Sequence, residues 1–249
     1  MSTIGIFDSG SGGLSVYREL VKLLPYERYI YFADDAWCPY GDKPATVIQE
    51  RARTITDILL GLGADVIVVA CNTATAAAIS TLRSEYPDVP FIGMEPAVKP
   101  AALGTRSGVI GVLATAGTLK GSKYLKTRGQ FEDNVKIVER VGQGFVELVE
   151  RGILDGEEAE KTVRASLQPL LDEGADIIVL GCTHYPFLAP LIQQIAGPGV
   201  TVIDPAPAVA RQTLRVMKER GIPVGDTSFS VDLYSSGMGD SLRRIFSYL

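Results

Sequence analysis

The sequence contains a repeat that restricts the fold to a duplicated unit. The apolar run at residues 66–70 is followed by Cys71, and the run at residues 177–181 is followed by Cys182, 111 positions later (182 − 71). Two more segments match at this offset without a gap: residues 63–65 with 174–176, and residues 96–98 with 207–209. We therefore expect an internal duplication in which Cys71 and Cys182 occupy equivalent places.

The apolar runs themselves predict strands of parallel sheets. Several lack polar alternation, which is typical of strands covered on both faces by helices. The expected strands are residues 4–8, 30–33, 66–70, 91–93, 109–113, 136–140, 177–181, 200–204 and 229–234. Helix-compatible stretches separate them, so we predict an α/β fold of two pseudo-symmetric, doubly wound lobes with the active site in the cleft between them.

The duplication also predicts the lobe boundaries. One lobe is expected at residues 1–98 and the other at residues 99–209. The tail, residues 210–249, contains a helical pattern at 211–220 and the last strand, and it is expected to return and complete the first lobe.

Composition excludes several classes of protein. The 249 residues carry a net charge of −5 and a pI near 5.1, which disfavours a basic face for nucleic acid. The first residues lack the pattern of a secretory signal, and no apolar run approaches the roughly 18 residues of a membrane span. We expect a cytoplasmic protein without membrane or direct nucleic-acid contacts. The cysteines, Cys38, Cys71 and Cys182, show no C-x-x-C spacing, so free thiols are expected, with no metal site and no disulfide.

Polar side chains follow four of the predicted strands, at the edge where ligands collect in such sheets. Any one of them could serve as a helix N-cap. All four together, with two matched cysteines among them, predict a site. These groups are Asp8-Ser9, Cys71-Asn72-Thr73, Thr115 and Cys182-Thr183-His184.

The first of these groups opens a glycine-rich loop, "DSGSGG" at residues 8–13. Backbone amides of such turns can hold an anion. The spacing matches neither the P-loop nor the dinucleotide motif, so a carboxylate or small zwitterion fits better than a nucleotide. Steric demands of a tight turn would explain the glycines equally well.

Two thiols on opposite sides of one cleft predict racemisation or epimerisation, in which one removes a Cα proton and the other returns one to the opposite face. A helix N-terminus lowers a thiol pKa from about 8.5 and would favour both thiolates, although free cysteines are often only small buried hydrophobes. Asn72, Thr73 and Thr183 would stabilise the developing charge. Hydrolysis by a Cys182-His184 pair would leave Cys71 without a role.

Six motifs in order between residues 6 and 186 resemble those of the glutamate racemases of bacterial cell-wall synthesis. They are "FDSGSGGLSV", "PYG", "VVACNTATA", "GMEPAVKPA", "IGVLATAGT" and "LGCTHYP". The resemblance implies a cofactor-independent enzyme that interconverts L- and D-glutamate, supplies D-glutamate for peptidoglycan and forms a homodimer. Trp37 stands where the family often has arginine.

Residue roles are also implied by the resemblance. Cys71 would handle the proton on the D-glutamate side, assisted by Asp8, and Cys182 that on the L-glutamate side, assisted by His184 with Glu150. The implied pocket residues are Ser9, Pro39, Tyr40, Gly41, Asn72, Thr73, Thr115, Thr118 and Thr183.

Three alternatives remain open at this point. The first is an aspartate or broad-specificity amino-acid racemase of the same superfamily. The second is a catalytically silent amino-acid-binding or regulatory protein, whose mark would be the loss of a cysteine. The third is an additional role as an inhibitor of DNA gyrase, which the acidic composition neither supports nor excludes.

Overall fold

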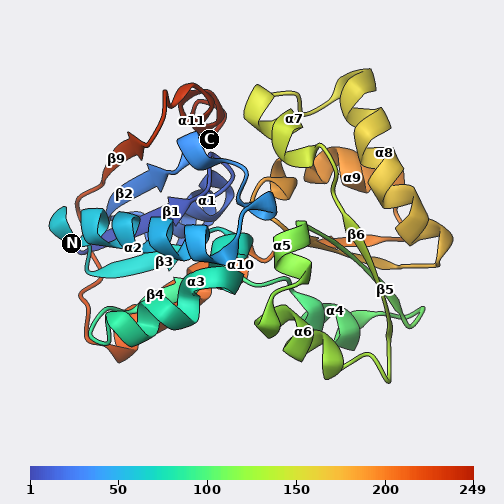
Figure 1. The fold of residues 1–249 in the computed structure, drawn as a ribbon, viewed down its shortest axis with the longest axis horizontal. Coiled ribbons are helices and arrows are strands. Elements are labelled where there is room, and N and C mark those ends of the chain that lie inside the picture. Colours follow the sequence, from blue (N-terminus) through green and yellow to red (C-terminus); the bar gives the residue numbers. More distant parts are fainter.

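The computed structural model describes residues 1–249 as two parallel β-sheets, each flanked by helices (Figure 1). The first sheet has the order β4-β3-β1-β2-β9 and the second β6-β5-β7-β8, and every strand pair is parallel. All nine predicted strands are present, so the predicted fold class is confirmed. Their bounds are β1 Thr3–Asp8, β2 Arg28–Ala33, β3 Val66–Val69, β4 Phe91–Gly93, β5 Val109–Ala114, β6 Lys136–Val141, β7 Ile177–Gly181, β8 Thr201–Ile203 and β9 Ser230–Ser235.

Eleven α-helices and three short 3₁₀ helices connect and cover these strands. The α-helices are α1 Leu14–Leu23, α2 Ala45–Gly61, α3 Asn72–Glu85, α4 Val98–Gly104, α5 Ala116–Leu119, α6 Ser122–Gly129, α7 Phe145–Arg151, α8 Gly156–Asp172, α9 Ala189–Ala196, α10 Ala206–Glu219 and α11 Asp240–Phe246. The 3₁₀ helices are η1 Asp35–Trp37, η2 Tyr40–Asp42 and η3 Tyr185–Leu188. None of the helices combines the length and the apolar character that crossing a bilayer requires.

The internal repeat is visible in the topology. Four strands of the first sheet, β4-β3-β1-β2, have the same order as β8-β7-β5-β6 in the second. Helices α2 and α8 each have 17 residues and begin 111 positions apart. The copies differ after the second cysteine, where η3 replaces the start of a long helix. Pro186 lies in η3, and proline has no amide to donate to a regular helical hydrogen bond.

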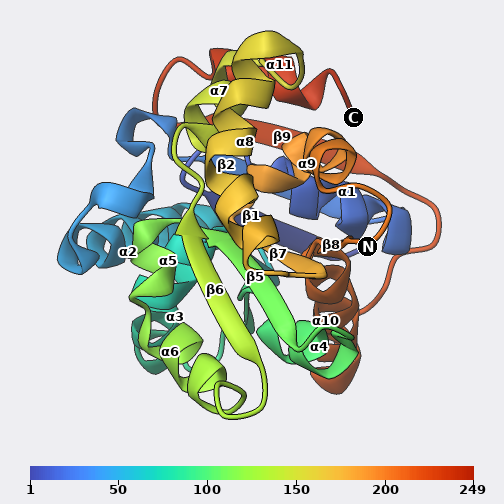
Figure 2. The same cartoon turned by 90° about the vertical axis from the view of Figure 1, so that its right-hand side faces the viewer.

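The apolar strands are buried on both faces, as their composition predicts. On β7, Ile178 and Leu180 pack in one cluster with Leu170 of α8. Val179 packs in another cluster with Ala101 of α4, and Figure 2 shows α8 and α4 on opposite faces of this sheet. The strand ends that follow these buried runs are therefore held rigidly.

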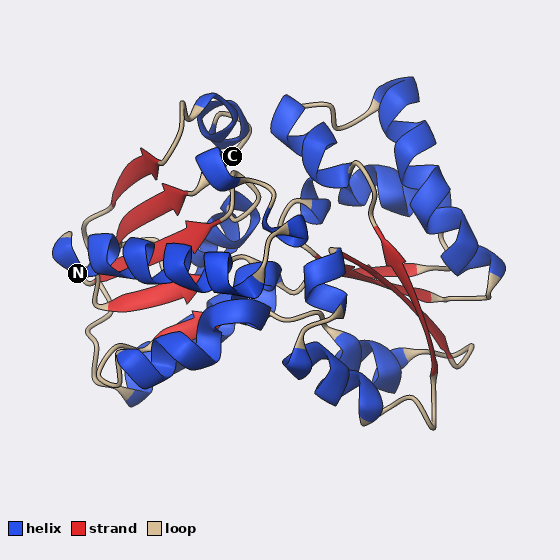
Figure 3. Cartoon of the chain, viewed as in Figure 1, coloured by secondary structure: helices blue, strands red, loops and turns tan.

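The C-terminal tail joins the first sheet, where β9 pairs with β2. Helix α10 packs on α1 of the same lobe, and α11 contacts α7 of the other lobe. The first-lobe strands direct their carboxyl ends toward the second lobe (Figure 3). The expected division between residues 209 and 210 lies inside α10, so the exact lobe boundaries stay a prediction.

Candidate active site

The four polar strand ends meet between the lobes. A hydroxyl of the second lobe, Thr183 Oγ1, donates to Asp8 Oδ1 of the first at 3.3 Å. Thr73 and Thr115, from opposite lobes, have their hydroxyl oxygens 2.8 Å apart. Ser15 Oγ of α1 donates to the Thr183 carbonyl at 2.9 Å. The structure therefore brings together the groups that the sequence places after β1, β3, β5 and β7.

Cys71 lies at the end of β3 and caps α3. Its sulfur accepts a hydrogen bond from Ala74 N at 3.4 Å, and its thiol donates to Ser9 Oγ at 3.8 Å. Burial raises the pKa of Cys71, and the nearby Asp8 carboxylate raises it further, although the Ala74 amide opposes this. The thiol thus lies at a helix N-terminus, as expected, and the Ala74 amide favours its thiolate, but burial and Asp8 outweigh that one amide.

Cys182 has a different environment, although it occupies the equivalent position in the repeat. It is followed by a turn and by η3, and α9 begins only at Ala189. The expected helix N-terminus at this thiol is therefore absent. The sulfur instead lies 3.8 Å from His184 Nδ1. The imidazole replaces the helix as the group that can exchange a proton with this cysteine or stabilise its thiolate.

His184 forms a buried ion pair with Glu150 of α7. The Nε2 to Oε1 distance is 2.6 Å, and the His184 side chain is 1% exposed. Burial lowers the pKa of His184, but its hydrogen bonds to Cys182 and Glu150 raise it well above 6.5. Burial likewise raises the pKa of Glu150, yet the contacts with His184 bring it down to about 2. The structure thus places Glu150 where the resemblance implied, against an imidazolium at neutral pH.

The glycine-rich loop serves the carboxylates of the protein itself. The amides of Gly10 and Gly13 donate to Asp8 Oδ2 at 3.2 and 3.0 Å, and the amide of Ser11 donates to Glu150 Oε1 at 2.8 Å. These three amides are therefore committed to carboxylates of the protein and are not free to hold a ligand. Burial raises the pKa of Asp8, partly opposed by the charge of His184.

Close packing explains two of these glycines. A Cβ on Gly12 would lie 2.3 Å from His184 Nδ1, and one on Gly10 would lie 2.4 Å from Glu150 Oε1. Only glycine allows the loop to approach the ion pair this closely. The steric explanation that the sequence left open is the one the structure supports.

Neutral polar groups line the other side of the strand ends. The hydroxyls of Thr73, Thr115 and Thr118 form one cluster, with oxygen distances of 2.8, 2.9 and 3.4 Å. Asn72 donates its amide to the Met94 carbonyl at 3.4 Å. Its buried Oδ1 has no hydrogen-bond partner, and buried oxygens of this kind usually have one. This oxygen is available to a donor such as an ammonium group.

Two of the three residues of the "PYG" segment line a cavity at the site, and the side chain of the third points elsewhere. Pro39 and Gly41 line a cavity of about 50 Å³ together with Thr115 and Tyr185. Tyr40 is 1% exposed, and its hydroxyl donates to Asp34. Its side chain is therefore committed to the first lobe, and Tyr40 can contribute only its backbone to the pocket.

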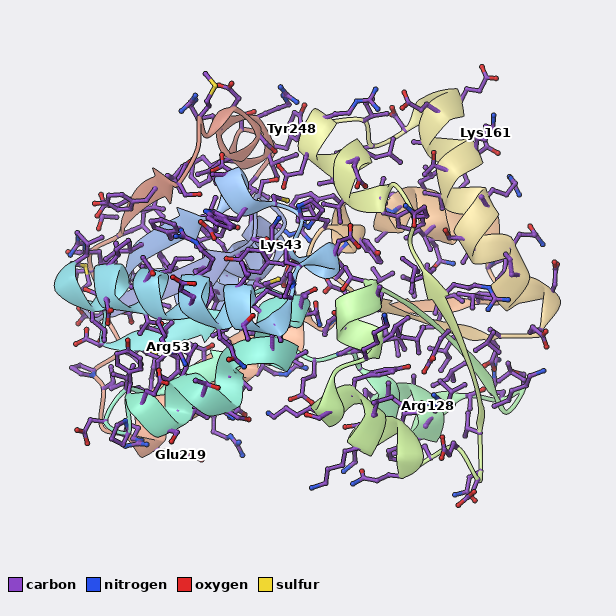
Figure 4. All side chains as sticks on the ribbon, viewed as in Figure 1. Lys43, Arg53, Arg128, Lys161, Glu219 and Tyr248 are labelled. Atoms are coloured by element: carbon purple, nitrogen blue, oxygen red, sulfur yellow. The ribbon has the colours of Figure 1, made fainter.

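The segment before "PYG" lies on the surface. Trp37 is 40% exposed, and the Arg51 guanidinium lies 5.2 Å from its ring centre. Lys43, near the seam between the lobes in Figure 4, lies 5.9 Å from the same ring. The tryptophan that replaces arginine thus forms cation–π contacts outside the cleft.

Sequence reasoning missed two groups beside the ion pair and one at the cavity that Thr115 lines. Ser11 Oγ donates to Glu150 Oε1 at 3.0 Å, and Ser241 Oγ of α11 donates to Ser11 Oγ at 3.1 Å. Tyr185 donates to the Gly142 carbonyl at 3.3 Å. Ser11 and Tyr185 lie inside recognised motifs, but no sequence signal links Ser241 to them across 230 positions.

Comparison with known proteins gives one consistent result. Residues 4–213 match the family described as Asp/Glu/Hydantoin racemase. Glutamate racemases from Ectopseudomonas mendocina and Methylococcus capsulatus are each 47% identical to this chain over 99% of its length, covering 94% and 91% of their own. A crystal structure of Escherichia coli glutamate racemase in complex with L-glutamate and the activator UDP-MurNAc-Ala superposes with a TM-score of 0.89 at 33% identity, covering 99% of this chain and 94% of that one.

Proposed function

Because this chain belongs to the Asp/Glu/Hydantoin racemase family and matches glutamate racemases over nearly its full length, we propose that it interconverts L- and D-glutamate without a cofactor, using Cys71 and Cys182. One observation carries the mechanism. The two thiols end equivalent strands of two lobes whose carboxyl edges face each other. An amino acid bound between them presents one face of Cα to each sulfur.

The proton transfers follow from this placement. With L-glutamate, the Cys182 thiolate takes the Cα proton, and the C–H electron pair enters a planar carbanion conjugated with the carboxylate. The Cys71 thiol then donates its proton to the opposite face, which yields D-glutamate and leaves Cys71 as a thiolate. The reverse reaction exchanges the two roles. This assignment of the thiols to the enantiomers rests on the resemblance to glutamate racemases.

Neighbouring acids and bases set the protonation of the two thiols, and they do so in different ways. His184, held protonated by Glu150, stabilises negative charge on Cys182. Asp8, whose pKa is raised by burial, accepts or returns the proton of Cys71. Raised carboxyl and imidazole pKa values suit proton exchange with thiols better than the ordinary values do.

The substrate charges find complementary groups in the same space. The unpartnered Asn72 Oδ1 accepts from the ammonium group. The hydroxyls of Thr73, Thr115, Thr118 and Thr183, with Ser9 and the backbone amides of Tyr40 and Gly41, donate to the carboxylates. Donors to the α-carboxylate stabilise the charge that develops there as the proton leaves.

Entry of substrate requires the lobes to separate. Cys71 and Cys182 are 5% and 6% exposed, and the cavity that Gly41 and Thr115 line, about 50 Å³, holds a few water molecules but not an amino acid with ten heavy atoms. Opening admits glutamate, and closure removes water from the thiols during proton transfer.

The test is proton NMR of L- and D-glutamate in D₂O with the purified protein and no added pyridoxal phosphate. We expect loss of the α-proton signal from both enantiomers, with the circular dichroism of each solution decaying to zero. Exchange of aspartate but not glutamate would instead identify an aspartate racemase. If no amino acid exchanged its α-proton, a binding or regulatory protein would be favoured.

The wider role follows from the same resemblance. We propose that the enzyme supplies D-glutamate for peptidoglycan, acts in the cytoplasm and forms a homodimer. Genetic complementation of a D-glutamate auxotroph and light scattering of the purified protein test the first and last of these. A supercoiling assay with added protein tests a separate effect on DNA gyrase.

A further inference from the structure

Cys38 is the one thiol that the proposed mechanism does not use, yet it lies beside the ion pair. The ligand-capable atoms of Cys38, Glu150 and His184 all lie within 4.8 Å of one another. They come from three separate segments: the loop before Pro39, helix α7 and the turn after β7. No spacing in the sequence reveals this group, and the sequence alone predicts no metal site.

We propose that Cys38, Glu150 and His184 form a binding site for Zn²⁺ or a similar borderline-soft divalent cation, and that occupation of this site inhibits the enzyme. The ion would be a regulatory or toxic ligand and not a cofactor of the reaction. The inhibitory part of this proposal rests on the proposed function, whereas the binding part does not.

The donor set matches the chemistry of zinc. Thiolate sulfur, imidazole nitrogen and carboxylate oxygen are its three usual protein ligands, with metal–ligand distances of about 2.0–2.3 Å. A tetrahedral ion therefore needs donors about 3.3–3.8 Å apart. His184 Nε2 and Glu150 Oε1 are 2.6 Å apart, and one ligand atom from each of Cys38, Glu150 and His184 lies within 4.8 Å of the other two. Shifts of about 1 Å would therefore bring three donors into place and leave a fourth position for water.

The surroundings support the ligands. The amide and hydroxyl of Ser11 hold Glu150 Oε1 at 2.8 and 3.0 Å. Hydrogen bonds of this kind orient metal-binding carboxylates. The side chain of His184 is fixed by its burial, and Gly10 leaves room beside Cys38 and Glu150, since a Cβ there would lie 3.1 Å from the Cys38 sulfur.

An acidic cavity provides a path to the site. It measures about 330 Å³, and both Cys38 and Glu150 line it. Three further acidic residues, Asp35, Glu147 and Asp240, line the same cavity, and the Asp240 carboxylate is paired with Arg243 at 2.7 Å. Carboxylates around an opening raise the local concentration of cations. A hard ion such as Mg²⁺ would bind weakly at Cys38 and His184, because sulfur and imidazole favour softer metals.

Binding would act directly on the Cys182 side of the reaction. The ion would take the nitrogen and oxygen that now form the His184–Glu150 hydrogen bond. His184 would then lose its Nε2 proton and with it the positive charge beside Cys182. Metal binding must also displace the proton of the Cys38 thiol and should strengthen as pH rises.

Cobalt chloride is the direct probe, because Co²⁺ bound to a thiolate shows a sulfur-to-metal charge-transfer band in the near ultraviolet. We expect this band in the full-length protein with a stoichiometry of one, and its loss in Cys38→Ser. Zinc chloride should inhibit racemisation of the unaltered protein, and Cys38→Ser should require at least about tenfold more zinc with its metal-free rate retained.

The readouts separate this proposal from the proposed function, since the cobalt band requires no turnover. A band that persists in Cys38→Ser would place the metal on Cys71 or Cys182 and overturn the proposal. Absence of any thiolate band with stoichiometric cobalt would overturn it as well. Equal zinc sensitivity of both proteins would refute the inhibitory site.

Discussion

Replacement of Glu150 by glutamine tests the ion pair at the centre of the site. The pKa of Glu150 falls from 4.5 to about 2, and each tenfold change in proton affinity corresponds to about 1.4 kcal/mol. The side chain is 19% exposed, so solvent screening removes little of this. We expect Glu150→Gln to lower the free energy of unfolding by about 3 kcal/mol at pH 7 and the racemisation kcat/KM by about 100-fold.

The pH dependence of this loss has a defined sign. A lowered carboxyl pKa contributes stability above pH 4.5 that disappears as pH falls toward 2. The raised pKa of His184 contributes stability that is complete below 6.5 and disappears only as pH rises through the raised value. The difference between the two proteins should therefore be constant from about pH 5 to 6.5, shrink in more acidic buffer, and shrink again as pH rises above 6.5.

Urea unfolding followed by circular dichroism at several pH values measures this difference. Glu147→Gln is the matched control, because it removes the same charge from an exposed position one turn earlier on α7. It should change the free energy of unfolding by less than about 0.5 kcal/mol. A loss below about 1 kcal/mol in Glu150→Gln, or one equal to that of the control, would refute the reasoning.

Four other substitutions probe the site and the first lobe. Cys71→Ser and Cys182→Ser should each lower kcat/KM from both enantiomers at least about 10³-fold, because a serine hydroxyl is a much weaker base; near-native turnover of either variant by polarimetry excludes two thiol bases. Gly12→Ala places a Cβ 2.3 Å from His184 Nδ1, so activity should fall about 100-fold with the circular dichroism spectrum kept, and an unchanged rate means the ring can move freely. Asp34→Asn breaks a buried pair in which a guanidinium nitrogen lies 2.7 Å from the carboxylate, which should cost about 3 kcal/mol in urea unfolding; a loss under about 1 kcal/mol contradicts that role.

The strands and the polar strand ends could be predicted because their signals are local. A run such as residues 66–69 has no polar side chain to place in solvent, so only a strand covered on both faces accommodates it. The four junctions follow from parallel topology, which places all carboxyl ends of a sheet at one edge. The repeat at 111 positions then predicts that two such edges are related.

The environment of each thiol could not be predicted in this way. The repeat places Cys71 and Cys182 equivalently, but the two copies diverge at Pro186, and no α-helix begins directly after Cys182. Contacts between Ser11 and Ser241, or between Cys38 and the ion pair, join segments far apart in the chain. They depend on how the lobes and the tail pack, and local composition carries no record of that packing.

Different groups assist the two thiols, and this is compatible with an equal kcat/KM for the two enantiomers. L- and D-glutamate have the same free energy in water, so kcat/KM must be equal in both directions whatever the site looks like. A change on one side, such as the loss of Glu150, must therefore slow both directions to the same extent. The symmetry that the chemistry requires lies in the positions of the sulfurs on either face of Cα, and the duplicated strands β3 and β7 supply it. The groups that hold and exchange their protons can differ, as Asp8 and the His184–Glu150 pair do here.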